Sequence, residues 1–234
     1  MKQKQLVDPP YEKKGDIIVQ NMPRRRFFTQ AAGLASIAAL AAACDKDDNN
    51  NNMSSGVDLG SGDFGILNYA YALEQLEAAF YTQVVATPYS GMNAAETSFM
   101  TDIRNHEIAH REFLKAALGS KAIQALEVDF SKINFTSRDS VLGTAKAFED
   151  LGVTAYDGAG YLLKDANYLL LAGKIVSVEA RHAALIRELI SANTFLGDQV
   201  DSNSVNLSRT PDEVLTIAGA YIKTKINASN LPKG

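Results

Sequence analysis

Two Glu-x-x-His patterns, each inside a long segment of helical periodicity, constrain the fold more than any other feature of the chain. They are Glu107-Ile108-Ala109-His110 and Glu179-Ala180-Arg181-His182. A spacing of three places both side chains of a pattern on one face of a helix, where they can bind a common metal ion. The chain has only three histidines, and two of them stand in these patterns. The sequence therefore predicts two helices that face each other across a metal site.

Apolar residues recur at close to 3.6 positions from residue 63 onward, which predicts helices. Asn93 and Glu96 form a capping-box pattern before the second helix, and Thr210 and Glu213 form one before the last. The expected helices span about 64–86, 94–118, 139–163, 165–193 and, more briefly, 210–223. Short connections make neighbours of the first and second and of the third and fourth, whereas residues 120–138 are long enough to return along the bundle. We expect an all-α four-helix bundle with one long crossover and a short C-terminal fifth helix.

A short internal repeat indicates the carboxylates that the other two helices supply. Ala72-Leu73-Glu74 with Tyr81 matches Ala147-Phe148-Glu149 with Tyr156, and in both the tyrosine follows the glutamate by seven residues. Seven residues are two helical turns, so each tyrosine shares a face with its glutamate. The predicted ligands are Glu74, Glu107, His110, Glu149, Glu179 and His182.

Three neighbouring residues leave alternatives open. Glu77 also lies on the apolar stripe of the first helix, so it is an accessory ligand or a substitute for Glu74. Tyr81 and Tyr156 either donate hydrogen bonds to ligand carboxylates or simply pack in the core. His106 points about 100° away from Glu107 around the helix, so we expect a surface or capping role and exclude it as a ligand.

The charge of this cluster favours metal. Four carboxylates that face an apolar interior would repel one another and raise each other's pKa. Two divalent cations would neutralise them. Mixed carboxylate and imidazole ligands suit iron, manganese or zinc better than calcium or copper. We expect two divalent ions, iron or manganese, with zinc as an alternative and no further cofactor.

The helix that carries Glu74 and the two Glu-x-x-His patterns also resemble a known family. Leu67-Asn68-Tyr69-Ala70 and the run from Leu73 to Tyr81 are similar to bacterial ferritin-like domain proteins that are related to plant desiccation-associated proteins. The resemblance covers about residues 63–195. It implies a ferritin-like bundle with a di-metal carboxylate site formed by the six ligands above, and it leaves the reaction open.

The N-terminal part of the chain has the order of an export signal. Arg24-Arg25-Arg26-Phe27-Phe28 resembles a twin-arginine signal, and it precedes an apolar stretch, residues 31–43, that is too short to span a bilayer. The sequence before Cys44 resembles a lipobox, which predicts lipidation of this cysteine; a free thiol beside an ordinary cleavage site is the alternative. We expect a signal peptide over 1–43 and a flexible tether over 44–62.

These features predict an exported lipoprotein of a bacterial cell envelope, on its periplasmic or surface side. After residue 43 the chain holds 16 basic and 24 acidic residues, so nucleic acid is not an expected partner. We divide the rest into a bundle over 63–195 and a C-terminal extension over 196–234. The leading hypothesis is a di-iron oxidase or a manganese-catalase-like oxidoreductase that reacts with oxygen or peroxide, without catalytic residues beyond the ligands. The alternative is a non-catalytic protein in which metal braces a structural or stress-protective bundle.

Overall fold

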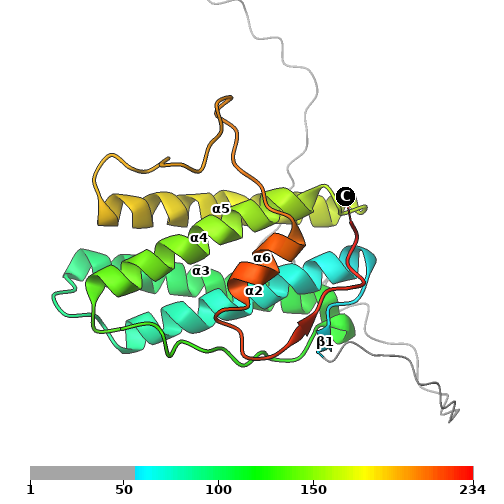
Figure 1. Cartoon of the computed structure of the whole chain (residues 1–234), viewed down its shortest axis with the longest axis horizontal. Helices are drawn as coiled ribbons and strands as arrows, with labels where there is room; N and C mark the ends of the chain where they lie inside the picture. The colour runs from blue at the N-terminus through cyan, green and yellow to red at the C-terminus, as the bar shows by residue number, and fades with distance from the viewer. Residues whose placement is uncertain (1–55, 234) are drawn as a thin grey trace, which may run out of the picture. The chain divides into compact units, whose positions relative to one another are not determined.

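The computed structural model describes residues 56–233, and they form helices with one small strand pair (Figure 1). In chain order the elements are β1 (Val57–Asp58), α2 (Gly62–Ala86), α3 (Ala94–Leu118), the 3-10 turn η2 (Gly119–Lys121), α4 (Arg138–Gly160), α5 (Ala166–Ile190), α6 (Pro211–Ala218) and β2 (Ile226–Asn227). The predicted signal peptide and Cys44 lie outside the described residues. Among the described helices, none is both long and apolar enough to cross a membrane.

The helix ends follow from local sequence. The Asn93 side chain accepts a hydrogen bond from the backbone N–H of Glu96, whose carboxylate accepts one from the backbone N–H of Asn93. Thr210 and Glu213 form the same capping box at the start of α6. Gly119 ends α3 with φ of 55°, a left-handed conformation that glycine adopts without steric cost. These caps stand where the sequence predicts them.

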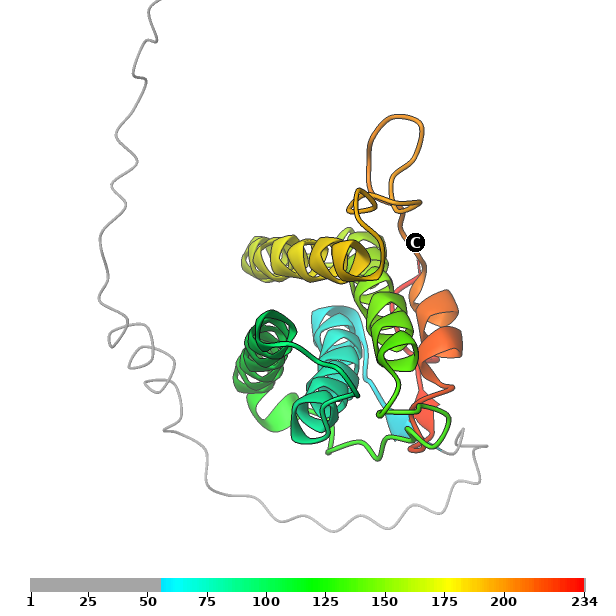
Figure 2. The same ribbon diagram turned by 90° about the vertical axis from the view of Figure 1, so that its left-hand side faces the viewer.

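Two antiparallel helix pairs, α2 with α3 and α4 with α5, make up the bundle (Figures 1 and 2). The long crossover, residues 119–137, carries the chain from one pair to the other. At one end of the bundle the Ser90 N–H donates to the carbonyl of Thr136. At the other end the backbone N–H groups of Lys164 and Asp165 donate to the Asp63 carboxylate. The predicted four-helix bundle with one long crossover and a short C-terminal helix is confirmed.

The crossover is held against the bundle by aromatic side chains. Phe80 of α2 is fully buried, and its ring lies 6.0 Å from that of Phe130 and 5.9 Å from that of Phe135, both in the crossover. Phe148 of α4 lies 5.1 Å from the same ring. Aromatic pairs at this separation stabilise beyond the area they bury. A segment with little helical periodicity is therefore fixed by the core of the first and third bundle helices.

The structure differs from the predictions at the two flanks of the bundle. Residues 57–58, which we assigned to a flexible tether, form β1 and pair in parallel with β2, and Leu59 after them is fully buried. The fifth helix ends at Ala218 rather than near residue 223. After it, the Tyr221 carbonyl and the Lys223 N–H bond to the crossover backbone, which an extended helix could not allow. Figure 2 shows α6 on the side of α4 that faces away from α5.

Close packing explains why residue 158 of α4 is a glycine. A Cβ atom at Gly158 would lie 1.8 Å from the carbonyl oxygen of Arg209, in the loop that precedes α6. Arg209 also bonds to Thr154 through its backbone N–H and its guanidinium group. The missing side chain thus lets the loop between α5 and α6 lie directly on α4.

Candidate metal centre

Each of the four bundle helices contributes acidic side chains to one point in the interior. Glu74 comes from α2, Glu107 and His110 from α3, Glu149 from α4, and Glu179 and His182 from α5. All four glutamates are fully buried, and His182 is 4% exposed. The six predicted ligands fall into two groups: Glu74, Glu107, His110 and Glu179; and Glu107, Glu149, Glu179 and His182. Within each group the ligand atoms lie within 4.8 Å of one another.

The first group surrounds Nδ1 of His110. This nitrogen lies 2.8 Å from Oε1 of Glu179 and 3.5 Å from Oε2 of both Glu74 and Glu107. The separation of three residues between Glu107 and His110 puts them on the same face of α3, as the sequence pattern predicts. Oxygen atoms from three helices and one nitrogen therefore converge on one place.

The second group surrounds Nδ1 of His182. This nitrogen lies 2.8 Å from Oε1 of Glu107, 3.4 Å from Oε2 of Glu149 and 3.7 Å from Oε2 of Glu179. Glu107 and Glu179 thus turn one oxygen towards each histidine. Glu74 belongs to the first group alone and Glu149 to the second alone. Two of the carboxylates are therefore shared between the two groups.

The two tyrosines of the sequence repeat contact Glu74 and Glu149, the terminal carboxylates that each belong to one ligand group alone, but they do so in crossed pairs. The Tyr81 hydroxyl of α2 donates to Oε1 of Glu149 on α4, and the Tyr156 hydroxyl of α4 donates to Oε1 of Glu74 on α2. Each hydrogen bond leaves the second carboxylate oxygen facing the histidines. Both roles considered for these tyrosines are seen, since each also packs in a hydrophobic cluster. The crossed hydrogen bonds join the two halves of the repeat.

Unpartnered buried atoms test whether the residues fit metal ions. In the described part of the chain, no partner meets the geometry of a hydrogen bond for these buried atoms, although each Nδ1 lies 2.8 Å from a glutamate oxygen: both carboxylate oxygens of Glu107 and Glu179, Oε2 of Glu74 and Glu149, and Nδ1 of His110 and His182. Such atoms normally cost free energy, because burial removes water and no well-directed hydrogen bond replaces it. Here they are six carboxylate oxygens and two imidazole nitrogens, the donor set of a mixed carboxylate and imidazole site. These groups could hold a metal ion, and the donors fit iron, manganese or zinc.

The electrostatics of the metal-free cluster lead to the same conclusion. Burial raises the pKa of Glu107 well above its ordinary value, and the charge of Glu179 raises it further. Burial also raises the pKa of Glu149, to about 7, although contact with His182 lowers it. Burial lowers the pKa of His110, but its contacts with carboxylates more than compensate and raise it to about 12. Without cations, the cluster therefore holds protons where metal would bind.

Glu77, the alternative ligand, lies in the same carboxylate cluster but in neither ligand group. Its pKa is raised well above the ordinary value by burial and by the charges of Glu179, Glu107, Glu149 and Glu74. A Cβ atom at Gly152 of α4 would lie 3.2 Å from Oε1 of Glu77, closer than ordinary van der Waals contact. Gly152, the repeat counterpart of Glu77, thus gives this fifth carboxylate its space.

His106 contacts the site, which the sequence analysis missed. It belongs to neither ligand group, but its Nδ1 lies 2.9 Å from Nε2 of His182, and the two rings are nearly parallel, at 10°. When Nε2 of His182 donates this hydrogen bond and Nδ1 of His106 accepts it, Nδ1 of a neutral His182 is left free for a metal. The sequence signal that could have predicted this contact was the spacing of four residues between His106 and His110. This spacing places His106 one turn earlier on the same side of α3.

A four-helix bundle with a glutamate from two helices and a Glu-x-x-His pattern from the other two defines the ferritin-like class of carboxylate proteins. Residues 62–192 match the model of the ferritin-like domain family, which is more than half of the chain. The chain belongs to this family. No curated protein matches the chain.

Proposed function

We propose that this chain is an exported di-metal carboxylate protein that holds two iron or manganese ions and reacts with oxygen or peroxide. The observation that carries the proposal is the sharing of Glu107 and Glu179 between the two ligand groups. Four buried glutamates also supply the four negative charges that two divalent cations neutralise. The donor set allows zinc as well, but zinc does not change its valence.

Under this proposal the residues have distinct tasks. When bound, a pair of such ions would exchange electrons with an oxidant. Glu107 and Glu179 would hold both ions at a fixed separation, and His110 and His182 would bind one each. The hydroxyls of Tyr81 and Tyr156 orient Glu149 and Glu74, and full burial shields the four glutamates from bulk water, whereas the His110 side chain is 13% exposed.

Purified protein supplied with Fe(II) or Mn(II) tests the activity. We expect it to retain two ions per chain and to consume oxygen or hydrogen peroxide. Glu107→Gln preserves the shape of the side chain but removes a bridging charge, so both metal content and turnover should fall. Glu112→Gln on the same helix is the control, because Glu112 is exposed and pairs with Arg111. Bound metal with no consumption of either oxidant would contradict the proposed reaction.

A metal-braced, non-catalytic protein is the competing function. It predicts a large rise in melting temperature with metal and no turnover of oxygen or peroxide. The same samples decide between the two functions, since both quantities are measured on the metal-loaded protein.

The sequence alone supports the parts of this proposal that concern export and lipidation. Replacement of Arg24 and Arg25 by lysine should leave the protein inside the cell if the twin-arginine signal is used. Cys44→Ser should abolish incorporation of labelled fatty acid and release the protein from membranes. Unchanged fractionation of both variants would contradict this part of the proposal.

A further inference from the structure

Four large apolar residues are exposed at one end of the bundle, and we call them the end patch: Phe64, Tyr161, Leu169 and Leu170. They come from the beginning of α2, the end of α4 and the beginning of α5, which lie together at the right-hand end of the bundle in Figure 1. Each of the four is between 41% and 64% exposed. Large apolar side chains that are exposed together mark a binding surface.

Contacts between the three helices hold the end patch together. The Asp63 carboxylate accepts hydrogen bonds from two backbone N–H groups in the turn between α4 and α5. The Phe64 ring lies 6.3 Å from the ring of Tyr168 on α5. A Cβ atom at Gly160 would lie 3.6 Å from Cδ1 of Leu169, which is ordinary van der Waals contact. The exposed side chains therefore belong to one surface.

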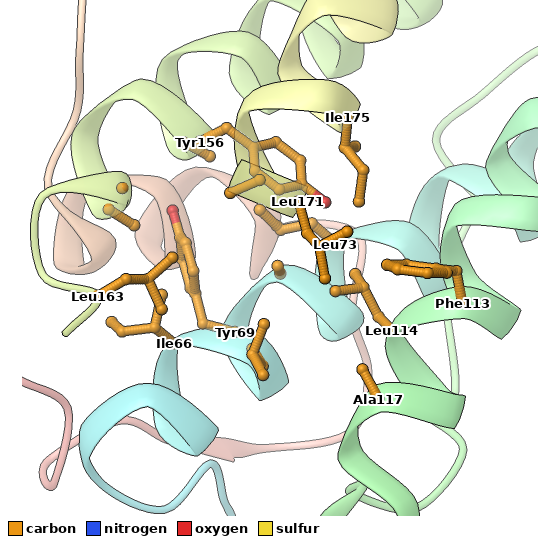
Figure 3. A pocket seen from close by; sticks show the side chains of 16 residues that line it. Ile66, Tyr69, Leu73, Phe113, Leu114, Ala117, Tyr156, Leu163, Leu171 and Ile175 are labelled. Atoms are coloured by element: carbon orange, nitrogen blue, oxygen red, sulfur yellow. The ribbon is translucent and has the colours of Figure 1, made fainter. Parts of the chain in front are cut away.

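The interior behind the end patch is already filled by other side chains. Figure 3 shows Leu171 and Ile175 of α5 pointing into the bundle, with Ile66 of α2 and Leu163 lining the same interior space. The volume left between them is about 20 Å³, which is roughly one water molecule. The core thus has no room for Leu170, and its apolar area is available to a partner.

The described chain enters the bundle at the same end. Three residues separate β1 from α2, and the Asn68 side chain donates to the carbonyl of Leu59 between them. Gly56 follows Cys44 by 12 residues, which span at most about 43 Å. The 25 residues of α2 rise about 37 Å towards the opposite end. A lipid on Cys44 could therefore bring the opposite end to a bilayer only if the connecting residues were almost fully extended.

Two lysines are exposed beside the end patch. Lys164 lies in the turn between α4 and α5, and Lys174 follows Leu170 by four residues on the same side of α5. The acidic residues here, Asp63 and Asp165, bind backbone N–H groups. Aliphatic, aromatic and lysine side chains together suit the surface of an anionic bilayer, where apolar groups enter the headgroup region and ammonium groups reach the phosphates.

We propose that the end patch binds the surface of an anionic lipid bilayer, so that the bundle stands on this end. The inference rests on the proposed lipidation of Cys44 and goes beyond it, because a lipid anchor alone does not orient the bundle. The contact needs little affinity of its own, since a short tether supplies an effective concentration that is roughly millimolar. A second copy of the chain is the other occupant that an apolar surface of this kind could have.

A single introduced tryptophan measures the contact, because the chain has no tryptophan, and Cys44 is its only cysteine. The full chain, produced without export, is coupled through Cys44 to a maleimide lipid in vesicles of phosphatidylethanolamine and phosphatidylglycerol. This coupling supplies the anchor whether or not the cell attaches one. Leu170→Trp should show blue-shifted emission and should lose emission when the acyl chains carry bromine. Tyr161→Trp takes its place as the probe, should Leu170→Trp not fold.

Ile190→Trp is the matched control. Ile190 is the last residue of α5, is 44% exposed and lies about 30 Å from Leu170 along the helix. We expect neither a blue shift nor quenching at this position, because it belongs to the opposite end of the bundle.

Three results would overturn the inference. They are the absence of quenching in coupled Leu170→Trp, equal quenching of both probes, and a blue shift of Leu170→Trp that grows with protein concentration without vesicles. The last result would show that a second copy covers the end patch. Quenching of Leu170→Trp without fatty acid on Cys44 in cells would instead contradict the proposed lipidation, while the lipid contact of the end patch would stand. The measurement needs no metal, so it is independent of the proposed reaction.

Discussion

The shared and terminal carboxylates should respond differently to the loss of charge. Glu107 faces both ligand groups, whereas Glu74 belongs to one. Replacement by glutamine keeps the size of either side chain and removes one negative charge. We therefore expect Glu107→Gln to lose both ions and Glu74→Gln to lose one, the ion held by His110.

The size of the effect follows from linkage between metal binding and folding. An ion present at 100 times its dissociation constant stabilises the folded state by about 2.7 kcal/mol. Two independent ions would contribute about 5 kcal/mol to the wild type, which for a domain of this size raises the melting temperature by roughly 10–20 °C. Glu74→Gln should keep about half of this shift, and Glu107→Gln almost none.

Calorimetric melts of each variant with and without Mn(II) measure the shift, and each variant is compared with its own metal-free form. This comparison removes any effect of the substitution on the metal-free fold, where one fewer carboxylate relieves repulsion. Glu112→Gln should behave as the wild type. Equal shifts in Glu107→Gln and Glu74→Gln would refute the assignment of Glu107 as a bridge.

Three further predictions concern the surroundings of the site. His106→Ala should weaken metal binding about 10–100-fold, because it removes a residue that orients a ligand, whereas the control Asn105→Ala should leave metal binding unchanged. Equal metal titration curves for the two variants would contradict this prediction. Gly158→Ala should destabilise the folded protein by about 1–3 kcal/mol, because the new Cβ atom meets the backbone of the loop. Gly143→Ala, whose Cβ atom would have no neighbour within 4 Å, should stabilise the folded protein by about 1 kcal/mol. Thermal melts that show changes of the same sign would refute the packing argument. Metal affinity should fall as the pH drops through the pKa of Glu149, which is about 7 in the metal-free protein, because a metal ion must then displace the proton on this carboxyl group. Calorimetry that detects no proton release on metal binding would contradict this prediction.

The sequence allowed the bundle and its ligand positions to be predicted because both depend on helical periodicity. Spacings of three and seven residues select one helix face, so Glu107 with His110 and Glu74 with Tyr81 could be placed without coordinates. Capping boxes fixed where α3 and α6 begin, since their chemistry is local.

Contacts between helices could not be predicted in the same way. The crossed hydrogen bonds from Tyr81 to Glu149 and from Tyr156 to Glu74 depend on how α2 and α4 face each other, which periodicity within one helix does not specify. The contact of His106 with His182 depends likewise on the approach of α3 to α5. The pairing of β1 with β2 joins residues far apart in the chain, and a Ser/Gly-rich sequence gave no sign of it.

Anomalous diffraction from crystals grown with Mn(II) tests the central claim most directly. We predict two manganese peaks between the four helices, one beside Nδ1 of His110 and one beside Nδ1 of His182, with Glu107 and Glu179 contacting both. A single peak, or peaks confined to the protein surface, would contradict the account.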